Sequence, residues 1–125
     1  MFYVYPEPTF VMARRRYQRP YAAPISVRSG EVVQIDRERS SSTDLFGWLW
    51  CRGPDGREGW TPEAWLEVSE DQGCATRDFS ALELDLEPGE RLQALFAESG
   101  FIFARKEGGE EGWAPDGLIV LAGPD

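Results

Sequence analysis

The sequence predicts an all-β fold, and three observations support this prediction. Thirteen glycines and nine prolines stand between short apolar stretches along the 125 residues, which is typical of many short strands joined by turns. No stretch keeps apolar residues at positions i, i+3, i+4 and i+7 over three turns, so no long amphipathic helix is expected. The chain also repeats itself. Together these observations favour two small β-units.

The repeat consists of four blocks that occur twice in the same order. GREGWTP at 56–62 reappears as GEEGWAP at 109–115, identical at five of seven positions. The spacing to the block before it is also the same in both copies. Gly47 lies 12 residues before Gly59, and Gly100 lies 12 residues before Gly112. The other pairs are ARRRY with ATRDF, GEVVQI with GERLQA, and GWLWCR with GFIFAR. The expected organisation is an N-terminal arm (1–11), a first repeat (12–69) and a second repeat (73–121).

Within each repeat the blocks predict strands and turns in order. In GEVVQI and GERLQA, alternate residues are apolar, which indicates strands with one buried face; the residues expected to be buried are Val33, Ile35, Leu92 and Ala94. The later blocks predict a hairpin in each repeat, with tight turns at 54–56 and 107–109, where glycine permits a positive φ.

Composition excludes several classes of function. The chain has no histidine, and its two cysteines have no CxxC spacing, so an enzyme, a metal site and a cofactor are not expected. The formal net charge of −9 argues against nucleic-acid binding. The sequence has neither a signal peptide nor a membrane-spanning stretch, so a cytoplasmic protein without a membrane partner is expected.

The ordered blocks of both repeats resemble the Src homology 3 (SH3) family. The family's opening ALYDY motif corresponds to residues 13–17 and 75–79, and its GYxPxxY segment to residues 59–65 and 112–118. The resemblance implies two small five-stranded barrels in tandem. Because a domain of roughly 60 residues buries only about 60% of the surface that its unfolded chain exposes, we expect the two barrels to pack against each other.

The resemblance also implies a groove of aromatic side chains that binds proline-containing peptides. Such peptides adopt the polyproline II conformation at little entropic cost, so flat aromatic surfaces can hold them. In the first repeat the matching residues are Arg15, Tyr17, Trp48, Pro62 and Trp65. The first loop, 18–24, has no acidic residue where the family grips basic ligands, so an acidic or uncharged partner is considered.

The second repeat departs further from the family pattern. Its matching residues are Phe79, Phe101, Pro115 and Leu118, none of which offers a hydroxyl or an indole N–H. We therefore expect its groove to be degenerate and its role to be structural or in protein docking.

Charge divides unevenly along the chain. Residues 1–69 carry nine basic and nine acidic side chains, whereas residues 70–125 carry four basic and thirteen acidic ones. The basic run of Arg14, Arg15, Arg16 and Arg19 therefore predicts an electrostatic contact with the second repeat, although solvated surface charges are the default interpretation. The proline-containing arm is expected either to occupy a groove in cis or to add an edge strand.

Two functions remain open at this stage. In the first, the chain is a non-catalytic binding module whose first repeat binds a protein or peptide partner that contains proline. In the second, it is a structural or oligomerisation module whose groove is filled in cis or by a second chain.

Overall fold

The computed structural model describes residues 2–42 and 46–121, so Met1 of the arm and residues 43–45 of the first repeat lie outside the described residues. The chain forms two compact units. The central unit comprises residues 21–82, and the composite unit combines residues 1–20 with residues 83–125. The chain thus leaves the composite unit after residue 20 and re-enters it at residue 83.

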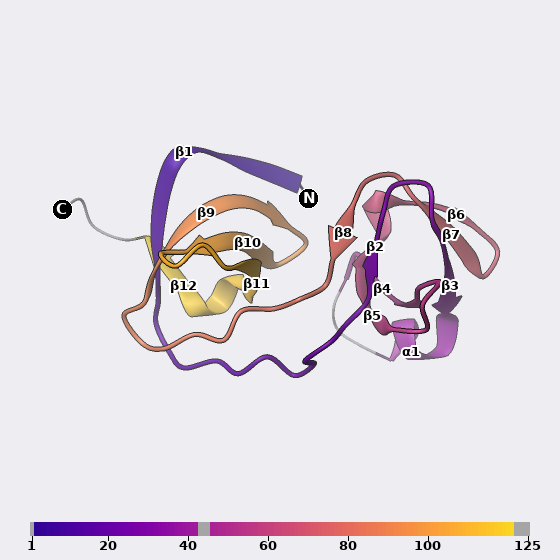
Figure 1. The fold of residues 1–125 in the computed structure, drawn as a ribbon, viewed down its shortest axis with the longest axis horizontal. Helices are drawn as coiled ribbons and strands as arrows, with labels where there is room; N and C mark the ends of the chain where they lie inside the picture. The colour runs from indigo at the N-terminus through magenta and orange to yellow at the C-terminus, as the bar shows by residue number, and fades with distance from the viewer. Residues whose placement is uncertain (1, 43–45, 122–125) are drawn as a thin grey trace. The chain divides into compact units, whose positions relative to one another are not determined.

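The central unit contains a five-stranded antiparallel sheet in the order β5-β4-β3-β7-β6 (Figure 1). A separate pair of short strands, β2 and β8, completes the unit. The strands are β2 (Ser26–Val27), β3 (Val32–Asp36), β4 (Trp48–Arg52), β5 (Glu58–Pro62), β6 (Leu66–Ser69), β7 (Gln72–Ala75) and β8 (Phe79–Ser80).

The composite unit contains a second five-stranded antiparallel sheet, in the order β11-β10-β9-β1-β12. Its core is a cluster of buried apolar side chains to which both parts of the chain contribute, including Val11 and Ala13 from β1 and Leu92 and Ala94 from β9. The strands are β1 (Phe2–Ala13), β9 (Arg91–Glu98), β10 (Phe101–Lys106), β11 (Glu111–Pro115) and β12 (Ile119–Leu121). These sheets confirm the all-β fold: each main sheet has five strands, and the central unit adds the β2–β8 pair.

The compact units do not coincide with the two repeats expected at 12–69 and 73–121. Each repeat gives its first strand to the sheet of the other repeat. β1 lies between β9 and β12, and β7 lies between β3 and β6 (Figure 1). The arm is therefore a strand as one alternative expected, but β1 lies inside the sheet and not at its edge.

The exchanged strands occupy equivalent places. Ala13 lies opposite Ile119 in the composite unit, and Ala75 lies opposite Leu66 in the central unit. The N–H of Ala13 donates to the carbonyl of Glu90 at 2.9 Å, and the N–H of Ala75 donates to the carbonyl of Glu31 at 2.9 Å. Because residues 13 and 75 are matching positions of the repeat, the two units have the same local architecture.

The alternation expected of the central strands is present. Val33, Ile35, Leu92 and Ala94 are all buried. Both hairpin turns use a glycine with a positive φ, 87° at Gly56 and 99° at Gly109. Side chains at these two positions would strain the backbone.

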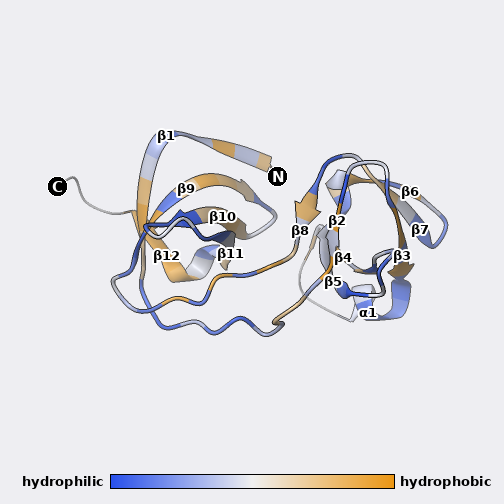
Figure 2. Ribbon diagram, viewed as in Figure 1, coloured by the Kyte–Doolittle hydropathy of each residue, from blue (hydrophilic) through white to orange (hydrophobic). Residues whose placement is uncertain are grey.

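One short helix was not expected from the sequence. Helix α1 (Arg37–Ser41) follows β3, and the carboxylate of Asp36 caps it by accepting from the N–H of Arg39 at 2.9 Å. None of its residues is buried, and Figure 2 shows it as a hydrophilic segment beside the more hydrophobic strands. Five residues are too few to produce the apolar periodicity by which helices are recognised.

Candidate functional site

The strand exchange divides both sets of predicted groove residues between the units. Arg15 and Tyr17 lie in the composite unit, whereas the other members of the first set lie in the central unit. The central unit thus holds Trp48, Pro62 and Trp65 together with Phe79, and the composite unit holds Tyr17 together with Phe101, Pro115 and Leu118.

The central-unit set is buried. Trp48 at the start of β4 lies opposite Pro62 at the end of β5, and the next turn carries Trp65. The rings of Trp65 and Phe79 meet edge to face, with centroids 5.5 Å apart. Trp48 is 5% exposed, Trp65 is 6% exposed, and Pro62 is also buried. These side chains therefore lack the exposure expected of an open groove.

The composite-unit set is half-buried. Tyr17, Phe101, Pro115 and Leu118 all keep part of their surface accessible. Phe101 lies opposite Pro115 across the β10–β11 pair, and the N–H of Arg14 donates to the carbonyl of Leu118 at 2.7 Å. Backbone pairing thus connects all the elements that carry this set. Arg15 is exposed on the segment between β1 and Tyr17.

Tyr17 is positioned by residues that the sequence did not single out. Its N–H and carbonyl both bond to Leu86, and its hydroxyl donates to a carboxylate oxygen of Glu83 at 2.6 Å. Glu83 in turn forms an isolated bridge with Trp113 of β11. Tyr17 is therefore held against β11 by an acidic residue of the second repeat.

Burial raises the pKa of the Glu83 carboxyl, although the hydrogen bond from Tyr17 opposes this shift. A raised folded-state pKa means that the contribution of Glu83 to stability is complete below its unfolded pKa of about 4.3 and is lost as pH rises through the folded pKa. Glu83→Gln is therefore expected to increase the free energy of unfolding at pH 7 while the difference shrinks toward pH 4. Urea unfolding at the two pH values measures this.

Asp85 provides a control of opposite sign. Hydrogen bonds from the backbone and side chain of Arg19 lower its pKa. Its contribution to stability is therefore present above the unfolded pKa of about 3.9 and is lost as pH falls through the folded pKa. Asp85→Asn should destabilise at pH 7. If the Glu83→Gln protein is less stable than the parent chain at pH 7, the result contradicts a raised pKa for Glu83.

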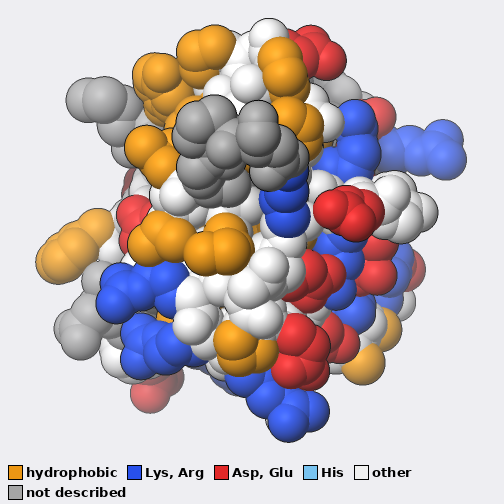
Figure 3. Space-filling view, turned by 90° about the vertical axis from the view of Figure 1, so that its left-hand side faces the viewer, with side chains coloured by type: hydrophobic (Ala, Val, Ile, Leu, Met, Phe, Trp, Pro, Cys, Tyr) orange, Lys and Arg blue, Asp and Glu red, His pale blue; other side chains and the backbone are white. Residues whose placement is uncertain are grey.

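The basic run of the first repeat pairs with acidic residues of the second repeat inside the composite unit. The N–H of Arg19 donates to Asp85 at 2.7 Å, and its guanidinium lies 3.1 Å from Asp85 and 3.2 Å from Glu110. Arg16 lies 3.5 Å from Glu87. Acidic and basic side chains are accordingly interspersed on the face shown in Figure 3. These ion pairs join residues of the two repeats within the composite unit, so the expected electrostatic contact between two separate barrels stays a prediction.

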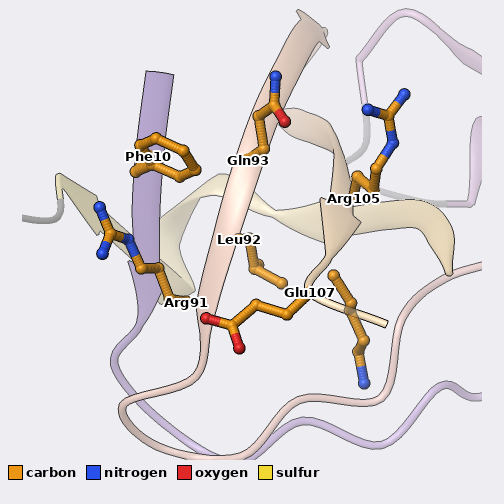
Figure 4. A pocket seen from close by; sticks show the side chains of 7 residues that line it. Phe10, Arg91, Leu92, Gln93, Arg105 and Glu107 are labelled. Atoms are coloured by element: carbon orange, nitrogen blue, oxygen red, sulfur yellow. The ribbon is translucent and has the colours of Figure 1, made fainter. Parts of the chain in front are cut away.

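A shallow pocket opens on the outer face of the composite sheet. Phe10, Gln93 and Arg105 lie in one row across β1, β9 and β10, and the Arg91 guanidinium lies 4.4 Å from the centre of the Phe10 ring (Figure 4). Arg105 contacts a carboxylate of Glu111 at 2.7 Å. Three of the seven residues that line the pocket are basic, Arg91, Arg105 and Lys106, and one, Glu107, is acidic.

Among residues 2–42 and 46–121, no group of three or more His, Cys, Asp and Glu side chains is arranged to hold a metal ion. Within the same described part of the chain, no helix has the length and apolar character needed to cross a bilayer.

Comparison with known families gives one match. Residues 11–69 match the family model of the variant SH3 domain, which covers the first repeat from β1 to β6. No curated protein sequence matches the chain significantly. The matched segment includes Val11 and Ala13, which fold into the composite unit, and ends before β7, which completes the central sheet. The match identifies a variant SH3 domain in residues 11–69, which are just under half of the 125 residues.

Proposed function

We propose that the chain is a non-catalytic interaction module that binds an extended, proline-containing peptide on the composite unit, through Tyr17, Phe101, Pro115 and Leu118. The observation that supports this proposal is the difference in burial between the two aromatic sets. The composite-unit set is half-buried, whereas the central-unit set, which contains three of the five residues predicted for the first groove, is buried.

The chemistry of the composite-unit set suits such a peptide. Aromatic, prolyl and leucyl side chains offer flat apolar surface, and a polyproline II segment loses little conformational entropy on binding. The carboxylates of the adjoining segment, Asp85 and Glu87, are bonded to Arg19 and Arg16. They would therefore provide little attraction for a basic ligand, so the preferred peptide is uncharged.

Phe101→Ala is expected to weaken peptide binding about fivefold or more, because truncating a central aromatic contact costs more than about 1 kcal/mol. Short synthetic proline-containing peptides in neutral, acidic and basic versions would be titrated into the full chain and followed by proton–nitrogen spectra. The neutral version should bind best.

Phe10→Ala serves as the matched control, because Phe10 is an exposed aromatic residue of the same unit that lies outside the proposed surface. Its affinity should equal that of the parent chain. Equal affinity for Phe101→Ala and the parent would contradict the proposal, as would peptide-induced shifts confined to the indoles of Trp48 and Trp65.

A second function is supported for the central unit. Trp48, Pro62, Trp65 and Phe79 are buried together, and the guanidinium of Arg77 lies 4.5 Å from the centre of the Trp65 ring. These contacts support a structural role, in which the aromatic set stabilises the fold and does not meet a ligand.

A further inference from the structure

We infer that charge decides which first strand completes which barrel: Arg16 and Arg19 direct the N-terminal strand to the acidic second repeat and thereby leave the central unit to β7. This inference is independent of the proposed peptide binding.

The first strands of the two repeats are equivalent at their ends. Ala13 and Ala75 occupy matching positions, and each bonds to matching backbone groups in its unit. The N–H of Gly89 donates to the carbonyl of Ala13 at 2.8 Å, and the N–H of Gly30 donates to the carbonyl of Ala75 at 2.7 Å. Backbone pairing at these two alanines would therefore be nearly the same if each strand stayed with its own repeat. Pairing at these two positions thus does not distinguish the observed exchange from the unexchanged arrangement.

The segments that follow the two strands differ strongly in charge. Residues 13–20 contain four arginines and no acid, whereas the matching residues 75–82 contain one arginine and one aspartate. The segments against which they pack also differ in charge, but with the opposite sign. Residues 83–90 contain four acids and no base, and the matching residues 24–31 contain one of each.

Only the observed exchange brings the two charged segments together. Arg16 lies 3.5 Å from Glu87, and Arg19 lies 3.1 Å from Asp85. In the central unit the two nearly neutral segments meet, and the N–H of Ser29 donates to Asp78 at 2.9 Å. If each strand stayed with its own repeat, four arginines and four acids would each face a neutral segment. Exposed ion pairs are individually weak, but several that all favour one arrangement give specificity.

The native thiol of Cys74 can report the arrangement. Cys74 lies opposite Glu67 in the central unit, whereas Val120 lies opposite Met12, the position that matches Cys74. The Cα atoms of directly opposite residues in antiparallel strands lie about 4.5–5.5 Å apart, and a disulfide can join residues at this Cα separation. A chain with both Glu67→Cys and Val120→Cys would therefore bond Cys74 to position 67 in the exchanged arrangement and to position 120 in the unexchanged one.

Cys51 does not compete in this experiment, because burial raises its pKa to about 11. The chain would be oxidised mildly at low concentration, and peptide mapping would give the ratio of 74–67 to 74–120 disulfides. We expect the 74–67 disulfide to predominate. Predominance of the 74–120 disulfide would overturn the inference.

Reversing the charges of Arg16 and Arg19 then tests whether charge selects the exchanged arrangement. In this background Arg16→Glu with Arg19→Glu should lower the ratio by about tenfold or more, because each substitution replaces an ion pair by like charges. Adding Asp85→Arg and Glu87→Arg should restore the ratio. Arg57→Glu is the matched control, because Arg57 pairs with Asp55 inside one hairpin turn, at 2.7 Å, and should leave the ratio unchanged.

An unchanged ratio in the folded Arg16→Glu, Arg19→Glu variant would overturn the inference. If that variant unfolds, the four-residue reversal decides the question. If the four-residue variant folds and has the parental ratio of 74–67 to 74–120 disulfides, the result supports selection by charge. If its ratio stays below the parental one, the result contradicts selection by charge.

Discussion

Ala75→Asp is expected to unfold the central unit and leave the composite unit folded, and Ala13→Asp is expected to do the reverse. Both alanines are buried, at 4% and 0% exposure. An uncompensated buried carboxylate costs several kcal/mol, which is comparable to the roughly 3–9 kcal/mol that stabilises a unit of about 60 residues. Tryptophan indole signals measure the effect, because Trp113 belongs to the composite unit and the other four tryptophans belong to the central unit.

Ala22→Asp provides the control, because this alanine is exposed and should tolerate a charge. If each repeat folded separately, the outcome would be opposite. Ala13→Asp would then shift the four central indole signals to random-coil positions, and Ala75→Asp would do the same to the Trp113 signal. That result would contradict the exchange of first strands.

Trp48→Ala is expected to lower the free energy of unfolding by about 3–5 kcal/mol, because it empties a large buried site. The side chain is 5% exposed in the central unit. An exposed ligand-binding tryptophan would cost far less to remove. Denaturant unfolding followed by the remaining indoles measures this difference.

Phe101→Ala is the matched variant at the equivalent position of the second repeat, where the side chain is half-buried. Phe101→Ala should lower the free energy of unfolding clearly less than Trp48→Ala does. A Trp48→Ala chain with unchanged stability and lost peptide binding would refute the structural role of the central set and favour an open groove there.

Much of the fold could be predicted from the sequence because its signals are local. The alternation in 30–35 and 89–94 predicts which side chains are buried, and glycine at Gly56 and Gly109 predicts the hairpin turns. Helix α1 was missed, because its only strong signal is the cap at Asp36.

The allocation of strands could not be predicted by similarity between the repeats. Ala13 and Ala75 sit in equivalent blocks, so sequence matching assigns each to its own repeat. The charge pattern was the available signal, because it pairs the arginine run with the acidic second repeat. Reading it as a contact between two complete barrels, however, missed the exchange that the contact accompanies.

The same uncertainty about which unit a first strand joins also affected the prediction of the candidate site. Tyr17 and Trp48 match one family groove, but the exchange places them in different units. Phe79 takes the place of Tyr17 in the central unit, where it packs against Trp65. Residue types could therefore be assigned from sequence, whereas their partners depended on long-range pairing.

The exchange of first strands is tested most directly by nuclear Overhauser contacts between Hα protons of opposite strands in the unmodified chain. The account predicts contacts from Ala13 to Ile119 and from Ala75 to Leu66, because these residues lie directly opposite each other. Contacts from Ala13 to Leu66 and from Ala75 to Ile119 would show that each repeat keeps its own first strand and would contradict the account.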